Sequence, residues 1–203
     1  MSEMWNKRYA ETKYIYGENV NVFFKQQLDQ LTPGYLLLPG EGEGRNATYA
    51  AKSWKVDAFD YSKQAVENSK AFFSARGVEV NMYEASILDH PLQTAKYDAI
   101  GLLFLHLNQE QRAVAHSFMI DALKPGGIIL MEVFSKKQIT RTTGGPKNAD
   151  WLYDVNDIRR DFSELDFLHL EEVETNLSEG PLHNGKAMVI RFVGRKRIPK
   201  CFD

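Results

Sequence analysis

The stretch YLLLPGEGEGRNATYA, residues 35–50, decides the fold of this chain. Its first five residues form a short apolar run between two Pro/Gly signals and predict a buried strand. GEGEG (40–44) then predicts a tight loop, because alternate glycines let the backbone turn sharply and approach a ligand closely. A helix is predicted to follow over 45–52. Strand, glycine loop and helix in this order indicate a ligand site at the end of the first strand of an α/β sheet.

Outward from this stretch, strands and helices alternate along the chain. Further strands are predicted over 54–59, 78–83, 97–105, 128–134, 168–174 and 186–195. Further helices are predicted over 21–31, 62–76, 109–123 and 150–162, the last with Asp150 as its cap. The link between the last two strands is too short for a helical crossover, so they are expected to pair as a hairpin. The sequence predicts an α/β fold: an open, mostly parallel, seven-stranded Rossmann-like sheet with helices on both faces and a C-terminal antiparallel hairpin.

Composition narrows the classes of function. The chain has 203 residues, with 25 Lys and Arg against 27 Asp and Glu, a net charge of −2. We expect one domain over 1–203, in which an arm and helix (1–31) cover the functional site. The charge balance argues against a nucleic-acid partner, and the longest apolar run (99–105) is far below the roughly 20 residues of a membrane span. With no signal sequence and one cysteine, Cys201, a cytoplasmic monomer or homodimer is expected.

Asp60 stands at the end of the second predicted strand, where a carboxylate can accept hydrogen bonds from ribose hydroxyls. An adenosine-containing cofactor is therefore expected. A dinucleotide would place its pyrophosphate at the helix that follows the glycine loop, but Glu41 and Glu43 would repel it by about 1 kcal/mol or more each. S-adenosylmethionine carries no phosphate and two cationic groups. The loop favours this cofactor, and an NAD(P)-dependent oxidoreductase is the alternative.

Several motifs together resemble the class I S-adenosylmethionine-dependent methyltransferases, in particular the small tellurite-resistance-type enzymes. These motifs are WNKRY (5–9), YG (16–17), LLLPGEGEGRNA (36–47), AFDYS (58–62), YDAI (97–100), LKPGG (123–127) and GGP (144–146). The resemblance runs over nearly the whole chain, and the glycine loop is its most specific part. It implies the seven-stranded fold and methyl transfer from S-adenosylmethionine.

The resemblance also implies a set of cofactor-binding residues. They are Gly40, Glu41, Gly42 and Gly44 at the methionine part, Asp60, Tyr61 and Ser62 at the ribose, Ala85, Ser86 and Ile87 at the adenine, Leu103 and Phe104 beneath the sulfonium, and Trp5, Tyr9 and Tyr16 folded over the cofactor. The sequence departs from the family twice. Residues 37–39 read Leu-Leu-Pro where an acid is usual, and Ser86 stands where an Asp is common. Glu41 or backbone carbonyls are then expected at the cofactor's ammonium group.

We expect in-line methyl transfer to a small-molecule acceptor. A thiolate, a chalcogen oxyanion or a similar soft nucleophile needs hardly any base, whereas an oxygen or nitrogen acceptor would use His106, Arg45 or His183 as catalytic residues. Each of these three is also compatible with a structural role at the rim of the site. The histidines are too scattered to indicate a metal site. A non-catalytic S-adenosylmethionine-binding module is a further alternative.

Overall fold

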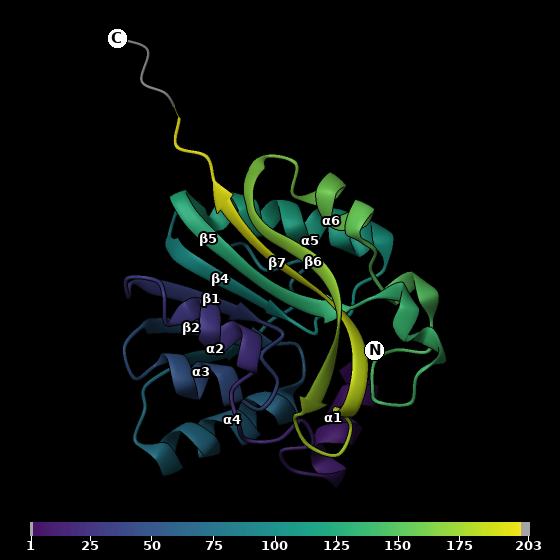
Figure 1. The fold of residues 1–203 in the computed structure, drawn as a ribbon. Helices are drawn as coiled ribbons and strands as arrows, with labels where there is room; N and C mark the ends of the chain where they lie inside the picture. Colours follow the sequence, from purple (N-terminus) through teal and green to yellow (C-terminus); the bar gives the residue numbers. More distant parts are fainter. Residues whose placement is uncertain (1, 200–203) are drawn as a thin grey trace.

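A computed structural model describes residues 2–199, so Cys201 lies outside the described part. Seven strands form one sheet in the order β3-β2-β1-β4-β5-β7-β6 (Figure 1). The strands are β1 (Tyr35–Pro39), β2 (Lys55–Asp60), β3 (Asn81–Glu84), β4 (Tyr97–Leu103), β5 (Leu123–Phe134), β6 (Leu165–Ser178) and β7 (Asn184–Lys196). The first five are parallel, and β7 pairs antiparallel with both β5 and β6. The predicted sheet and C-terminal hairpin are confirmed.

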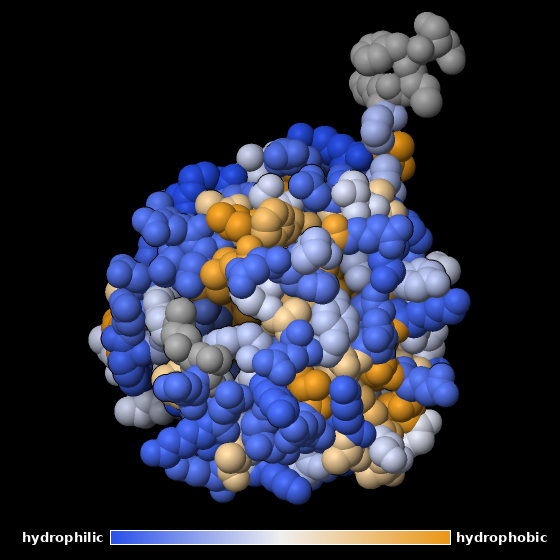
Figure 2. Space-filling view, turned by 180° about the vertical axis from the view of Figure 1, so that it is seen from behind, coloured by the Kyte–Doolittle hydropathy of each residue, from blue (hydrophilic) through white to orange (hydrophobic). Residues whose placement is uncertain are grey.

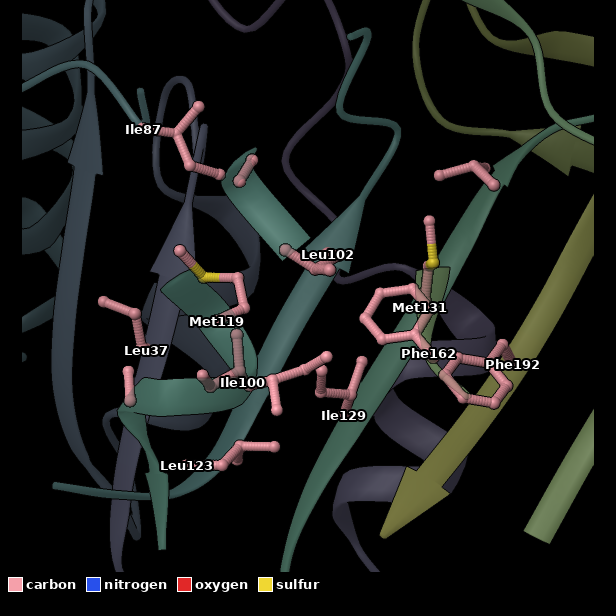
Figure 3. Packing of buried hydrophobic residues seen from close by; sticks show 14 of the residues in the cluster. Leu37, Ile87, Ile100, Leu102, Met119, Leu123, Ile129, Met131, Phe162 and Phe192 are labelled. Carbon is pink, nitrogen blue, oxygen red and sulfur yellow. The ribbon is translucent and has the colours of Figure 1, made fainter. Parts of the chain in front are cut away.

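Helices cover both faces of the sheet. They are α1 (Ser2–Glu11), α2 (Val22–Leu28), α3 (Arg45–Ala50), α4 (Lys63–Arg76), α5 (Gln109–Ala122) and α6 (Val155–Asp161), with short 3-10 turns η1 (Lys136–Thr140) and η2 (Ala149–Trp151). Leu37, Ile100 and Leu102 pack with residues of α5 and α6 on one face (Figure 3). Leu36 and Ala99 pack with α2, α3 and α4 on the other face. Because successive strand residues point to opposite faces, an apolar run such as β1 feeds both cores.

Local signals in the sequence fix the ends of several helices. Ser62 caps α4 by accepting a hydrogen bond from the N–H of Ala65, and Gly77 ends it in the left-handed conformation (φ 63°). Asn108 and Gln111 form a reciprocal capping box at the start of α5. These ends place the loops after β2 and β4 at the carboxyl edge of the sheet.

The C-terminal hairpin reaches beyond the sheet. Phe134, the last residue of β5, lies opposite Val189, so residues 184–188 of β7 continue past the end of β5 together with the paired part of β6. The turn that joins the two strands, residues 179–183, lies beside α1 and the segment that follows it (Figure 1). The hairpin therefore overhangs the carboxyl ends of the parallel strands.

The structure corrects some predicted boundaries. α6 begins at Val155 with Asp154 as its cap, so Asp150 is not the cap of a helix over 150–162. Leu152 and Tyr153 are buried (0% and 1% exposed) and precede the helix because the Asp154–Asp157 capping box starts it later. The last two strands are longer than predicted. β3 is shorter than predicted, and β5 extends back through the LKPGG stretch to Leu123.

Hydrophilic residues cover most of the face opposite to that of Figure 1, and hydrophobic residues lie among them in small groups (Figure 2). Within residues 2–199, none of the helices has both the length and the hydropathy that crossing a membrane requires.

Candidate active site

The strand order reverses between β1 and β4, which is where open α/β sheets bind ligands at their carboxyl edge. The glycine loop leaves β1 at this point. Gly42 has φ 65°, and a Cβ there would lie 2.8 Å from the hydroxyl of Tyr9. Gly44 has φ 91°, and a Cβ there would lie 2.5 Å from the ring of Phe73. Both positions therefore require glycine, Gly42 for approach to the site and Gly44 for packing of the loop on α4.

Asp60, the last residue of β2, is anchored beside this loop. Its Oδ2 accepts a hydrogen bond from the N–H of Gly42 (3.0 Å), and its Oδ1 accepts one from the N–H of Ser62 (2.8 Å). Burial raises the pKa of Asp60 to about 6, although the N–H groups of Ser62, Gly42 and Tyr61 favour the ionised form. The carboxyl group is thus ionised at neutral pH and held in a fixed orientation.

The two acidic residues of the loop bind parts of the protein itself. Glu41 accepts hydrogen bonds from the N–H groups of Asn46 (2.8 Å) and Ala47 (2.7 Å), at the N-terminus of α3. Burial raises the pKa of Glu41 to about 7. Glu43 accepts hydrogen bonds from the N–H groups of Tyr14 (2.8 Å) and Ile15 (3.0 Å). Glu41 therefore caps the helix, and Glu43 ties the N-terminal arm to the loop.

Three aromatic rings of the N-terminal arm lie over the loop. The ring centroids of Trp5 and Tyr9 are 5.8 Å apart, and that of Tyr16 lies 6.2 Å from Trp5 and 6.4 Å from Tyr9. The guanidinium of Arg8 stacks on Trp5 at 4.6 Å and donates a hydrogen bond to the hydroxyl of Tyr16 (3.0 Å). Burial raises the pKa of both Tyr9 and Tyr16, so these hydroxyls are protonated at neutral pH. We call Trp5, Tyr9 and Tyr16 the aromatic roof.

The roof, the glycine loop and the end of β4 enclose a cavity. The empty space of this cavity, including the solvent at its open mouth, is about 960 Å³. The predicted site residues that line it are Trp5, Tyr9, Tyr16, Gly40, Glu41, Gly42, Arg45, Asp60, Tyr61, Leu103, Phe104, His106 and His183. Glu43 of the glycine loop and Leu105, which the resemblance also places at the methionine part and beneath the sulfonium, line it as well. Residues that the sequence did not single out for this site complete the lining: Gly17, Pro39, Asn46, Gly101 and Trp151. The cavity thus brings together segments from both ends of the chain.

Five predicted cofactor residues do not line this cavity. Gly44 packs on α4, as described above, and Ser62 caps α4 while its hydroxyl donates to Asn6 (2.7 Å). The N–H of Ala85 donates to the backbone oxygen of Asp60 (3.0 Å). The Ser86 hydroxyl accepts from the N–H of Leu88 (3.1 Å), and Ile87 is 9% exposed and packs in the core. Residues 85–87 therefore lie next to Asp60 but outside the cavity wall.

The three candidate catalytic residues line the cavity in different settings. His106 stacks on Phe134 with the ring planes 20° apart, and burial lowers its pKa to about 3, so it is a neutral and weakly basic imidazole. His183 comes from the overhanging hairpin turn, and burial also lowers its pKa. Arg45 donates to the carboxylate of Glu179 (2.8 Å) and to the backbone oxygen of Asn19 (3.2 Å). The Arg45 guanidinium is thus already paired within the protein.

A buried polar network behind the cavity was missed by the sequence analysis. Asn21 donates to the carboxylates of Glu179 (2.9 Å) and Glu132 (2.7 Å), and Glu132 also accepts from Arg191 (2.6 Å). The partners lie up to 158 residues apart, as Asn21 and Glu179 do. No local pattern marks such a network, because polar residues that pair in the core look like surface residues in the sequence. Within the described residues, no group of three or more His, Cys, Asp or Glu is placed to hold a metal ion.

Residues 37–127, which include the end of β1, the glycine loop, Asp60 and β4, match the family model of a methyltransferase domain. Residues 37–127 are thus similar in sequence to a methyltransferase domain. The match includes the strand end, loop and acid that the sequence analysis assigned to S-adenosylmethionine, and the domain implies this cofactor. No curated protein matches the chain significantly.

Several solved structures share the fold of this chain. One, described under "Conversion of a Disulfide Bond into a Thioacetal Group during Echinomycin Biosynthesis", has a TM-score of 0.81 and 15% identity over 99% of this chain and 94% of the other. TehB from Haemophilus influenzae has a TM-score of 0.73 and 18% identity over 88% of this chain and 63% of TehB. The [4+2]-cyclase SpnF has a TM-score of 0.72 and 15% identity over 98% and 95% of the two chains. These likenesses show the fold, and that of TehB agrees with the tellurite-resistance-type resemblance of the motifs.

The geometry of the cavity fits S-adenosylmethionine. Asp60 is ionised and fixed at the carboxyl end of β2, where a ribose can reach it. The left-handed glycines, which have no side chains, alternate with Glu41 and Glu43 in the loop, and neutral aromatic rings cover it. Aromatic faces attract cations, so the aromatic roof suits the sulfonium of S-adenosylmethionine better than the pyrophosphate of a dinucleotide.

Proposed function

We propose that the protein transfers a methyl group from S-adenosylmethionine to a small-molecule acceptor. The observation that carries this proposal is the cavity that joins Asp60, the glycine loop and the aromatic roof at the switch point of the sheet. When bound, the cofactor supplies a methyl group on a sulfonium, which is a good leaving group without help from the protein. The residues of the chain then have to bind the cofactor and the acceptor, orient them for in-line transfer and exclude water.

The cavity residues suggest how the cofactor is held. Asp60 receives the ribose hydroxyls, and Gly40 and Gly42 let the methionine part lie against the loop backbone. Leu103 and Phe104, at the end of β4, form the floor below the sulfonium. We keep residues 85–87 as the proposed adenine neighbours, because Ala85 is hydrogen-bonded to the backbone of Asp60.

The N-terminal segment 1–31 is proposed to cover the bound cofactor. Trp5, Tyr9 and Tyr16 form the roof, and Glu43 holds the segment down through the N–H groups of residues 14 and 15. Walls made by this arm, by Trp151 and by His183 suit a small acceptor rather than a polymer. Since Glu41 already caps α3, the ammonium contact is assigned to backbone carbonyls.

The position of Glu41 also argues against the dinucleotide alternative. A pyrophosphate binds to the free N–H groups at the N-terminus of the helix after the glycine loop. Here the N–H groups of Asn46 and Ala47 already donate to the Glu41 carboxylate. A phosphate would have to displace this buried acid, so an NAD(P)-dependent oxidoreductase is disfavoured.

We assign the acceptor to the part of the cavity that is lined by Phe104, His106, Trp151 and His183. The carboxylate of Glu179, in the hairpin turn, does not line the cavity. Burial lowers the pKa of both His106 and His183, and so does the positive charge of Arg8; Arg45 lowers the pKa of His183 as well. We propose a thiol, a chalcogen oxyanion or a similar small nucleophile as the acceptor. A soft anion reacts at this wall with little need for a strong base.

The test begins with calorimetric titration of the protein with S-adenosylmethionine, S-adenosylhomocysteine and NADH. We expect the first two to bind and NADH to give no heat of binding. Incubation with S-adenosylmethionine and a panel of small thiols, with the demethylated cofactor measured as product, then tests transfer. NADH binding alone would overturn the cofactor assignment. Cofactor binding without product from any acceptor would favour the non-catalytic module.

A further inference from the structure

Glu179, in the hairpin turn, is the centre of three contacts. Its Oε2 accepts a hydrogen bond from Arg45 (2.8 Å), and its Oε1 accepts one from Asn21 (2.9 Å). The same Oε2 lies 3.5 Å from Nδ1 of His183. The turn itself is closed by hydrogen bonds between the backbones of residues 179, 180 and 183. The carboxylate and the imidazole are therefore held side by side on a rigid turn, both about 5% exposed.

The His183 ring is fixed in its plane by three aromatic neighbours. Its centroid lies 4.7 Å from Tyr16, 4.7 Å from Phe104 and 5.2 Å from Phe134. Nδ1 is buried and makes no hydrogen bond within the described residues, and the Glu179 carboxylate 3.5 Å away is its ion-pair neighbour. His183 lines the cavity but Glu179 does not. Nδ1 thus faces Glu179, and Nε2 is the other ring nitrogen, 3.5 Å from where a Cβ on Gly144 would lie.

We propose that Glu179 is a positioning residue that keeps the proton of His183 on Nδ1, so that Nε2 accepts a proton from an O–H or S–H acceptor. This inference rests on the proposed methyl transfer and extends it to acceptors that are not ionised beforehand. The acceptor atom bonds to the methyl carbon as the carbon–sulfur bond breaks and its electron pair stays on sulfur. The acceptor's proton goes to Nε2 and then to water.

The surrounding charges are consistent with this role. Although burial opposes ionisation, His183 and Arg45 hold the pKa of Glu179 at about 2, so the carboxylate is charged. Burial, with Arg45 and Arg8, lowers the pKa of His183, while Glu179 opposes this effect. His106 faces the same cavity as a neutral ring, and Tyr16 contacts His183 with its hydroxyl protonated. His183 is therefore neutral at pH 7 and ready to accept a proton.

The first test measures the protonation of His183 directly, without any acceptor. In ¹⁵N-histidine-labelled protein, a His183→Asn variant assigns its signals among the five histidines. We expect the Nδ1–H tautomer in the unsubstituted protein and a lower pKa of His183 in Glu179→Gln. The matched control is Glu132→Gln, because Glu132 bonds to the same Asn21 and is 1% exposed but does not contact His183. The control should leave both values unchanged, and an Nε2–H tautomer or an unshifted pKa in Glu179→Gln overturns the proposal.

The second test uses two acceptors that differ in ionisation at pH 7. 2-Mercaptoethanol is protonated, whereas 4-nitrothiophenol is ionised. General-base assistance contributes about 10²–10⁴-fold, so His183→Asn should lower kcat/KM for 2-mercaptoethanol by about this factor and change that for 4-nitrothiophenol about threefold or less. Equal losses with both thiols refute the proposal. Absence of S-adenosylmethionine binding would instead refute the proposed function, and the tautomer measurement separates the two failures.

Discussion

Replacement of Asp60 by Asn should affect the stability of the ligand-free protein more favourably at alkaline than at acidic pH, while it weakens cofactor binding. Burial raises the pKa of Asp60 from 3.8 to about 6. A raised pKa of an acid means that the folded state disfavours its charged form, so the protonated carboxyl group does not lower the free energy of unfolding at low pH. The loss of free energy of unfolding grows as the pH rises from the pKa of Asp60 in the unfolded state to its pKa in the folded state. At about 1.4 kcal/mol per pH unit, the full loss is about 3 kcal/mol.

The asparagine brings its own cost, because its NH₂ group replaces an oxygen that accepts from the N–H of Gly42 or Ser62. A buried donor left facing another donor costs about 1–3 kcal/mol, but this cost does not depend on pH. The decisive quantity is therefore the difference between pH 8 and pH 4 in the effect of Asp60→Asn on the free energy of unfolding. We expect this difference to favour the variant at pH 8 by about 2–3 kcal/mol.

Cofactor binding should change in the opposite direction. Loss of charge from two hydrogen bonds to ribose hydroxyls is worth roughly 2–3 kcal/mol, or about 30- to 150-fold in Kd. Urea unfolding at the two pH values and calorimetry with S-adenosylhomocysteine measure the two effects. Asp98→Asn is the control, because Lys124 and the N–H of Tyr35 lower the pKa of Asp98 against the effect of burial, at the opposite edge of the sheet. This control should lose stability at pH 8 and keep its affinity. Equal effects of Asp60→Asn at both pH values, or unchanged affinity, would refute the reasoning.

Two further predictions concern the N-terminal arm. Gly180→Ala should displace the aromatic roof, because the new Cβ would lie 2.4 Å from the backbone nitrogen of Gly17. The control is Gly77→Ala, since Gly77 has the same left-handed conformation but no atom within 4 Å of the new Cβ. Both variants should lose about 1–2 kcal/mol of stability to backbone strain, but only Gly180→Ala should bind the cofactor more weakly in calorimetry. Equal affinities would contradict this contact. Glu43→Ala should remove the hydrogen-bond acceptor of the N–H groups of Tyr14 and Ile15. Trypsin cleavage at Lys13 should then increase at least tenfold, which corresponds to a loss of more than about 1.4 kcal/mol in local stability. Excess S-adenosylhomocysteine should restore protection, and unchanged cleavage would show that other contacts hold the arm.

The acidic glycine loop disfavours a dinucleotide by more than charge repulsion. Charge repulsion from Glu41 and Glu43 was the reason to disfavour a dinucleotide. In the structure Glu43 binds the arm, and Glu41 fills the helix N-terminus that a pyrophosphate would need. The objection to phosphate therefore rests on occupied hydrogen-bond donors as well as on charge.

The sequence by itself determined the sheet, the glycine loop and the place of Asp60. Their signals are local: apolar runs of strand length, glycines at fixed spacing, and an acid at a strand end. Parallel strands then bring these carboxyl ends to one edge whatever the remaining contacts are. The helix over 62–76 also has local signals at its ends, the cap Ser62 and the terminal Gly77, and both act within one turn.

Only the tertiary structure decided which residues face the cavity and which serve as support. Ala85 and Ile87 were predicted at the cofactor but lie outside the cavity wall, while Trp151 enters it from a loop without a readable pattern. Arg45 and Glu179 meet across 134 positions. A polar side chain in the sequence does not reveal whether water or another buried group satisfies it, because that partner is chosen by packing of distant segments.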